Sequence, residues 1–257
     1  MRLRQFVLVT GLLLLSSLSL AQRQVIIVGG GPDPLESQVS IELNTRWIID
    51  NIKVHEPTQI SHVLYTDGNQ PGPDVHSTKD IRDGIDMLEP LARVYNMEEE
   101  NSYWYYSSRV NTDVGPADAE SVSNLLREIV TDLNEHDELL FIFQGHGGHN
   151  YEDTRKNYLR LWNDSRITVF ELEKLLSEAP PESTIRFLLP QCFSGAFSKL
   201  IYRNAQPDQG LATGNRCGFL ATNEHRGSEG CTASVDTSEY RDYSSIFFGA
   251  IFGKTID

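Results

Sequence analysis

The chain has 257 residues, of which 22 are Lys or Arg and 36 are Asp or Glu, so its formal net charge at pH 7 is −14. This length is near the upper range for one domain, and a single large core is expected. A negative charge of this size argues against nucleic acids and anionic lipid surfaces as partners, because they carry the same sign.

The first 21 residues have the layout of a secretory signal peptide. Arg2 and Arg4 precede an apolar run over residues 6–20, and residues 19–21 offer a small-x-small cleavage site. The run is shorter than the roughly 20 residues of a bilayer span. We therefore expect cleavage near Ala21 and an exported protein, periplasmic or secreted, with no stable membrane insertion of the mature domain over residues 22–257.

The first elements predicted after this segment are those of an α/β fold. Residues 25–28 form a continuous apolar run that ends in glycines, which is typical of a buried parallel strand. A helix is expected over residues 37–53 and a second strand over residues 62–65, ahead of a turn-rich stretch. Residues 75–115 show only short helical and aromatic pieces and allow no firm assignment.

The clearest helix follows, because its apolar residues recur at helical spacing. They are Val122, Leu125, Leu126, Ile129, Val130 and Leu133. Next come a core strand at 139–143 and a strand or hairpin arm at 158–162. Thr168 and Glu171 then form a capping box that starts another helix, expected to end at Pro180.

The last third of the chain repeats the alternation of strand and helix. Strands are expected at 185–189 and 217–222, separated by a loop over 201–216, and an apolar helix at 246–252 closes the chain. Strands that alternate with helices and end in glycine-rich loops predict a mostly parallel sheet covered by helices on both faces. Neither internal repeats nor an interdomain linker are visible in the sequence.

Two reactive side chains follow two of these strands. His146 comes after the strand at 139–143, and Cys192 comes after the strand at 185–189. In an open α/β sheet, ligands bind beyond the carboxyl ends of the strands, so both side chains are expected to face one substrate. A histidine can deprotonate a thiol and then protonate a departing amine, while backbone amides such as those of Gly147 and Cys192 stabilise an oxyanion.

The segments FQGHGG (143–148) and QCFSG (191–195) resemble the two catalytic blocks of the caspase, metacaspase and legumain group of cysteine peptidases. This resemblance implies a three-layer caspase-like domain, a His146–Cys192 dyad, the Gly147 amide in the oxyanion hole, a peptide or protein substrate and no cofactor. It also implies a pocket for the residue before the cleaved bond, near the ends of the first strand and the strand at 217–222. Pro190 stands where many metacaspases and legumains carry an acid, so the substrate preference does not carry over.

Other functions remain open at this stage. The same dyad could transfer the acyl group to an amine, as a transpeptidase does, or the domain could be a binding module that has lost turnover. An α/β-hydrolase-type esterase is disfavoured, because Pro190 replaces the first glycine of the nucleophile motif and His146 precedes the nucleophile.

Several further residues have both a functional and a structural interpretation. Cys217 and Cys231 could pair in an oxidising compartment and leave Cys192 free, but spacing cannot decide this. The acids that could line a pocket for a basic side chain are Glu224, Glu229 and Asp236. A zinc site at His146 and His149, a phosphate cradle at residues 29–31 and a calcium site at Asp67 and Asp74 are each disfavoured against ordinary loops. No metal is expected.

Overall fold

The computed structural model describes residues 21–257 apart from residues 56–59, 79–102, 111–113, 255 and 257. The predicted signal segment lies outside the described residues except for Ala21, so cleavage and export stay predictions. In the described part of the chain, no helix is both long and apolar enough to cross a membrane.

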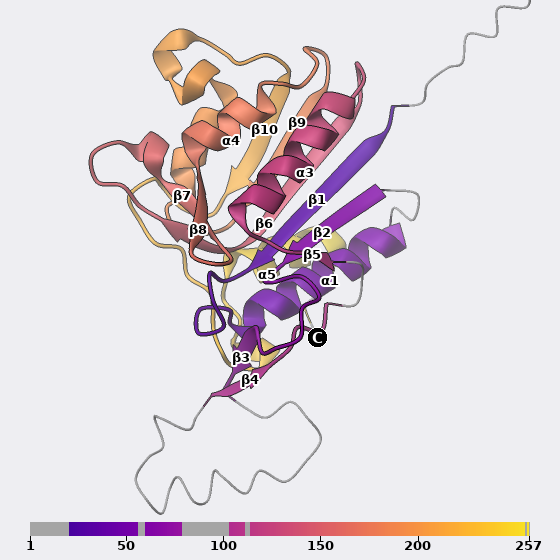
Figure 1. Ribbon diagram of the computed structural model, residues 1–257, viewed down its shortest axis with the longest axis vertical. Helices are drawn as coiled ribbons and strands as arrows, with labels where there is room; N and C mark the ends of the chain where they lie inside the picture. Colours follow the sequence, from indigo (N-terminus) through magenta and orange to yellow (C-terminus); the bar gives the residue numbers. More distant parts are fainter. Residues whose placement is uncertain (1–20, 56–59, 79–102, 111–113, 255, 257) are drawn as a thin grey trace, which may run out of the picture.

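An eight-stranded sheet forms the centre of the molecule (Figure 1). Its main path runs β10-β9-β6-β1-β2-β5, and all neighbours on this path are parallel. These strands are β1 (Arg23–Gly30), β2 (Ile60–Tyr65), β5 (Val114–Gly115), β6 (Glu138–Gly148), β9 (Thr184–Leu189) and β10 (Asn215–Leu220). The chain builds outward from β1 in one direction and then in the other, and such a switch point leaves a crevice beyond the strand ends.

Four shorter strands lie outside this main path. The hairpin of β7 (Tyr158–Leu161) and β8 (Ser165–Thr168) extends the end of β6 through antiparallel pairing. A separate two-stranded sheet joins β3 (Val75–Ser77) to β4 (Trp104–Tyr106). β3 and β4 fall within residues 75–115, for which the sequence allowed no firm assignment. Each is only three residues long, which is too short for a clear pattern in the sequence.

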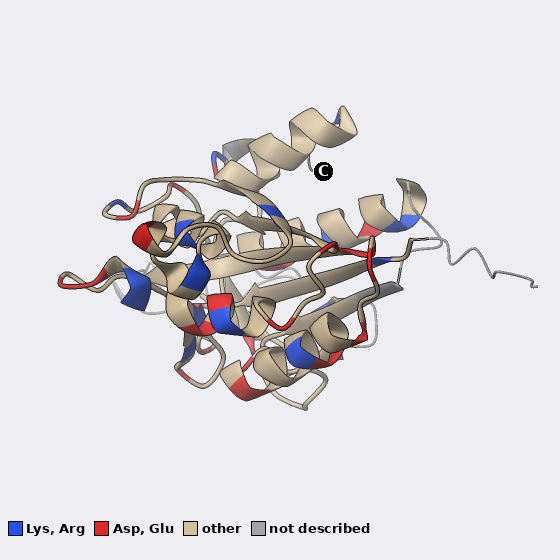
Figure 2. Ribbon diagram, turned by 90° about the horizontal axis from the view of Figure 1, so that it is seen from above, with Lys and Arg blue, Asp and Glu red and all other residues tan. Residues whose placement is uncertain are grey.

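Helices cover both faces of the sheet, as predicted (Figure 1). On one face lie α3 (Ala119–Asp132) and α4 (Val169–Leu176), and on the other lie α1 (Val39–His55) and α5 (Tyr243–Phe252). Side chains alternate along β1, so Ile26 and Val28 pack in the first layer while Val25 and Ile27 pack in the second. The three-layer α/β fold is therefore confirmed. Figure 2 shows acidic and basic residues interspersed over the helices and loops around the sheet.

Short 3-10 helices fill the connections: η1 (Thr154–Lys156), η2 (Ser194–Ile201), η3 (Arg203–Ala205), η4 (Pro207–Gln209) and η5 (Thr237–Glu239). The predicted strand at 217–222 begins and ends two residues earlier, and the helix expected to reach Pro180 ends at Leu176. The capping box of Thr168 and Glu171 is present as predicted. The prediction that the strand ends before His146 is wrong, because pairing with β7 carries β6 on to Gly148.

Candidate active site

His146 lies near the end of β6, and a loop that follows β1 holds its imidazole. Nε2 of His146 is 2.8 Å from the backbone oxygen of Glu36 and 2.9 Å from Oε1 of Gln38. Both partners are carbonyl oxygens, which only accept, so Nε2 donates and carries the proton. Nδ1 is left as the basic nitrogen. Burial lowers the pKa of His146, which favours the neutral ring at neutral pH.

An ion pair anchors the loop that contacts this histidine. The carboxylate of Glu36 pairs with the guanidinium of Arg160 through two contacts, one of them 2.9 Å long. Arg160 lies on β7 directly opposite His146 in the antiparallel register. The strand pair that carries the histidine therefore also fixes the backbone carbonyl that orients it.

Cys192 follows β9 after two residues, at a sharp change of chain direction. Phe193 adopts a left-handed backbone with φ of 59°, and η2 starts at the next residue. The amide of Ser228 donates to Sγ of Cys192 over 3.3 Å, and the amide of Phe193 donates to the carbonyl of Arg226 over 2.8 Å. Sγ of Cys192 also lies 3.7 Å from the carbonyl oxygen of Ser228, to which the thiol donates, so the backbone of Ser228 contacts the sulfur both as donor and as acceptor.

Gly147 of β6 packs tightly against the loop that carries Cys192. A Cβ added at this position would lie 2.0 Å from the backbone oxygen of Cys192 and 2.7 Å from Cγ of Gln191. Only glycine allows this packing. The structure therefore places Gly147 against the backbone of Cys192, which gives a packing reason for the glycine beside its predicted role as an oxyanion donor.

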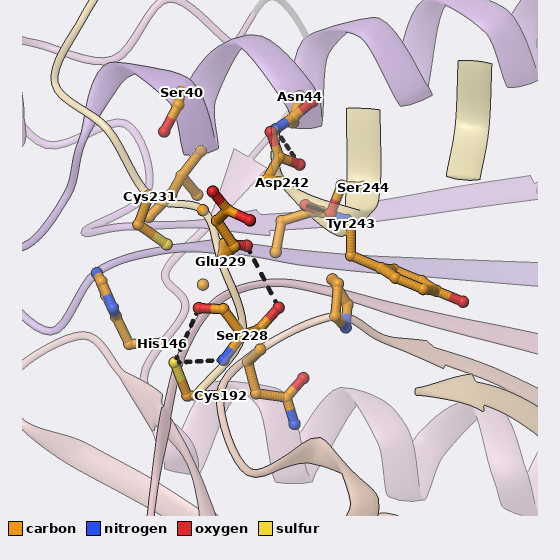
Figure 3. Close-up of a pocket in the computed structure, with 16 residues that line it drawn as sticks. Ser40, Asn44, His146, Cys192, Ser228, Glu229, Cys231, Asp242, Tyr243 and Ser244 are labelled. Atoms are coloured by element: carbon orange, nitrogen blue, oxygen red, sulfur yellow. Dashed lines mark hydrogen bonds between the residues drawn. The ribbon is translucent and has the colours of Figure 1, made fainter. Parts of the chain in front are cut away.

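His146 and Cys192 line a common cavity of about 230 Å³ (Figure 3). The walls come from the ends of β6 and β9, the segment 228–231, the first turns of α1 and the start of α5. The lining residues are Ser40, Ile41, Asn44, Gln144, Gly145, His146, Pro190, Gln191, Cys192, Ser228, Glu229, Gly230, Cys231, Asp242, Tyr243 and Ser244. The fold thus brings together the two residues that the sequence singled out.

All three cysteines are free thiols. Cys217 is exposed on the edge strand β10, whereas Cys231 is partly buried and lines the cavity with Cys192. Burial, together with the neighbouring Cys192 and Asp242, raises the pKa of Cys231 to about 12. The pairing of Cys217 with Cys231, which the sequence left open, is not formed here.

The acids that the sequence offered for a pocket separate in the structure. Glu229 lines the cavity. Glu224 forms an ion pair with Lys199, which lowers the pKa of its carboxyl, and Asp236 caps η5 by accepting from the amide of Ser238. Asp242 and Asn44 also line the cavity, and sequence reasoning missed both. Asp242 is the N-cap of α5, just before an apolar run, and its side chain accepts from the Ser245 amide. An aspartate directly before an apolar helix is a capping signal that the sequence offered.

The residues considered for metals make other contacts. His149 stacks on Phe193 with ring centroids 4.8 Å apart, so it does not share the contacts of His146. The carboxylate of Asp74 accepts from the Thr66 hydroxyl and the Ser108 amide. Among the residues described, no group of three or more His, Cys, Asp or Glu side chains is arranged to hold a metal ion.

No family model matches the sequence, and no curated protein sequence matches it either. Among solved structures, the crystal structure of protein GSU0716 from Geobacter sulfurreducens is similar. The match has a TM-score of 0.52 and 11% sequence identity, and it covers 90% of this chain and 83% of that chain. A likeness at this identity concerns the fold alone.

Proposed function

We propose that the chain is an exported cysteine endopeptidase of the caspase and legumain type. The observation that carries the proposal is the shared cavity, in which Cys192 receives an amide hydrogen bond and His146 is oriented by two acceptors on Nε2. This arrangement leaves Nδ1 of the histidine as the base, which is the role that thiol activation requires.

The proposed reaction has two halves. Nδ1 of His146 takes the thiol proton, and the Cys192 sulfur attacks the peptide carbonyl carbon to give a tetrahedral oxyanion. The amides of Gly147 and Cys192 are the donors proposed for that oxyanion, and such a donor contributes about 3 kcal/mol to the transition state. The C–N bond then breaks as His146 protonates the amine, and water hydrolyses the thioester.

Alkylation of Cys192 by iodoacetamide between pH 5 and 9, followed by peptide mapping, tests the dyad. We expect selective labelling below pH 7 that slows in His146→Ala and disappears in Cys192→Ala, because an ordinary thiol has a pKa of about 8.5. Exposed Cys217 is an internal reference in the same protein. Labelling of Cys192 no faster than that of Cys217 would contradict the proposal and favour a binding module.

Cleavage products then separate two uses of the dyad. An endopeptidase releases one fragment with a new carboxyl end and one with a new amino end. The masses of these two products stay the same when a primary amine is added. A transpeptidase joins the added amine to the new carboxyl end, and mass spectrometry distinguishes the two products.

A further inference from the structure

The loop over residues 31–38, which follows β1, supplies both acceptors of the His146 ring. Nε2 of His146 lies 2.8 Å from the backbone oxygen of Glu36 and 2.9 Å from Oε1 of Gln38. A Cβ added at Gly31 would lie 2.1 Å from the Glu36 oxygen, so the loop packs closely on itself. The position of the His146 proton therefore depends on what holds this loop in place.

Strand β3 is attached to the end of this loop and lies beside it (Figure 1). The amide of His76 donates to the carbonyl of Ser37 over 3.0 Å, and His76 forms an isolated parallel bridge with Gln38. Ser37 stands between the two residues that contact the His146 ring. The small sheet of β3 and β4 is thus joined directly to the loop that orients the histidine.

The side chain of His76 makes a second attachment to the loop. Its Nδ1 lies 2.8 Å from the backbone oxygen of Pro34. A carbonyl oxygen only accepts, so Nδ1 donates and carries the proton. His76 is 3% exposed, and the rings of Tyr103 and Tyr105 lie 5.1 and 5.8 Å from its own. A hydrogen bond from a ring in such surroundings is stronger than the same bond in water, because the local dielectric constant is low.

Two separate elements therefore hold the loop. Arg160 on β7 pairs with the carboxylate of Glu36, and His76 on β3 bonds to Pro34, two residues earlier in the loop. Burial lowers the pKa of His76, which favours the neutral ring at neutral pH. A neutral ring adds no charge near His146, so its effect on the site comes from geometry.

We propose that His76 is a positioning residue for His146. Its bond to Pro34 keeps the loop 31–38 at the place where the loop's two acceptors hold the histidine proton on Nε2, which leaves Nδ1 as the base. The inference rests on the proposed function, in which His146 takes the proton of Cys192. It gives a role in the site to β3, which lies outside the main sheet.

The test measures the His146 tautomer and the reactivity of Cys192 in the full chain. His76→Phe keeps a ring but removes the donor, whereas His76→Asn keeps a donor close to the position of Nδ1. We expect the ring nitrogen shifts of His146 in His76→Phe to report a mixture of tautomers. Alkylation of Cys192 at pH 7 should slow by about tenfold or more, because small displacements of catalytic groups have effects of this size. His76→Asn should stay near wild type in both measurements.

His55→Phe, the same change at an exposed position at the end of α1, is the matched control and should alter neither measurement. Wild-type shifts and rates in His76→Phe would overturn the inference even if the variant were less stable, because a merely structural residue leaves the tautomer unchanged. Equal changes in His76→Phe and His76→Asn would overturn it as well, since the donor would then not matter. If His76→Phe does not fold, His76→Gln replaces it with the same expected results, because its amide reaches the position of Nε2 instead of Nδ1.

The wild-type protein separates failure of this inference from failure of the proposed function. If Cys192 of the wild type labels selectively below pH 7 and His76→Phe behaves identically, the dyad stands and the role of His76 is wrong. If Cys192 labels no faster than Cys217 but His76→Phe still changes the tautomer, His76 positions the His146 ring and the peptidase proposal fails.

Discussion

The side-chain oxygen of Gln38 lies 2.9 Å from Nε2 of His146 and shares that nitrogen with the backbone oxygen of Glu36. A neutral acceptor at this position fixes the tautomer without adding charge. A carboxylate at the same place would do both, because a negative group favours the charged imidazolium.

Gln38→Glu should therefore raise the pKa of His146, which burial holds below its usual value in the wild type. The measurement is an NMR titration of the His146 ring, together with the ring nitrogen shifts that report the tautomer. Gln209→Glu, at an exposed position in η4, is the matched control and should leave His146 unchanged. A His146 titration curve that is identical in Gln38→Glu and wild type would show that Gln38 does not position the ring.

Gly147 and Gly227 give a paired test of the packing around Cys192. Gly147→Ala places a Cβ 2.0 Å from the Cys192 oxygen, so the cysteine loop must move, whereas Gly227→Ala makes an ordinary 3.6 Å contact with Sγ. We expect Gly147→Ala to lower the free energy of unfolding by about 1–3 kcal/mol. It should also slow Cys192 alkylation, while Gly227→Ala stays close to wild type in stability. Chemical denaturation and labelling rates check both, and equal losses in the two variants would contradict this account.

The sequence predicted the fold well, because its elements rest on local patterns, and His146 and Cys192, which it singled out, line one cavity. The apolar run at 25–28 and the helical face from Val122 to Leu133 identify buried elements without any knowledge of their neighbours. Gln38 and Asn44 were not predicted as site residues. Each reaches the site through a hydrogen bond between residues more than 100 positions apart in the sequence. The local pattern of residues in one sequence does not indicate contacts over such a separation. The same holds for Cys231, whose approach to Cys192 depends on the loop after β10.

Asp74 is expected to make stability depend on pH in the direction opposite to that of most carboxylates. Burial raises its pKa from 3.8 to about 6, so the folded protein binds this proton more tightly than the unfolded chain does. This raised pKa corresponds to roughly 3 kcal/mol of destabilisation above pH 6, and the destabilisation disappears as the pH falls toward 4.

Asp74→Asn, which is uncharged at every pH, isolates this contribution. Asparagine can still accept from the Ser108 amide, as the carboxylate does. The variant should gain stability relative to wild type at pH 7.5, and the two unfolding free energies should converge between pH 6 and 4.5. Urea denaturation across this range is the measurement. Curves for the two proteins that run parallel would mean that Asp74 titrates alike in the folded and unfolded states.

Cys231 should not react with iodoacetamide in the folded protein, although it lines the same cavity as Cys192. With a pKa of about 12, roughly one molecule in a thousand carries the thiolate at pH 9, and only the thiolate reacts with iodoacetamide. Mass mapping after alkylation of the folded protein at pH 7 to 9 should therefore find Cys217 and Cys192 modified and Cys231 unmodified. In 6 M guanidinium chloride, where burial is lost, all three cysteines should react. Cys231→Ala should leave the rate at Cys192 near that of wild type, because a neutral thiol at position 231 places no charge beside the Cys192 sulfur. Modification of Cys231 in the folded protein at a rate similar to that of Cys217 would instead show that the segment 228–231 opens and exposes the cavity from that side.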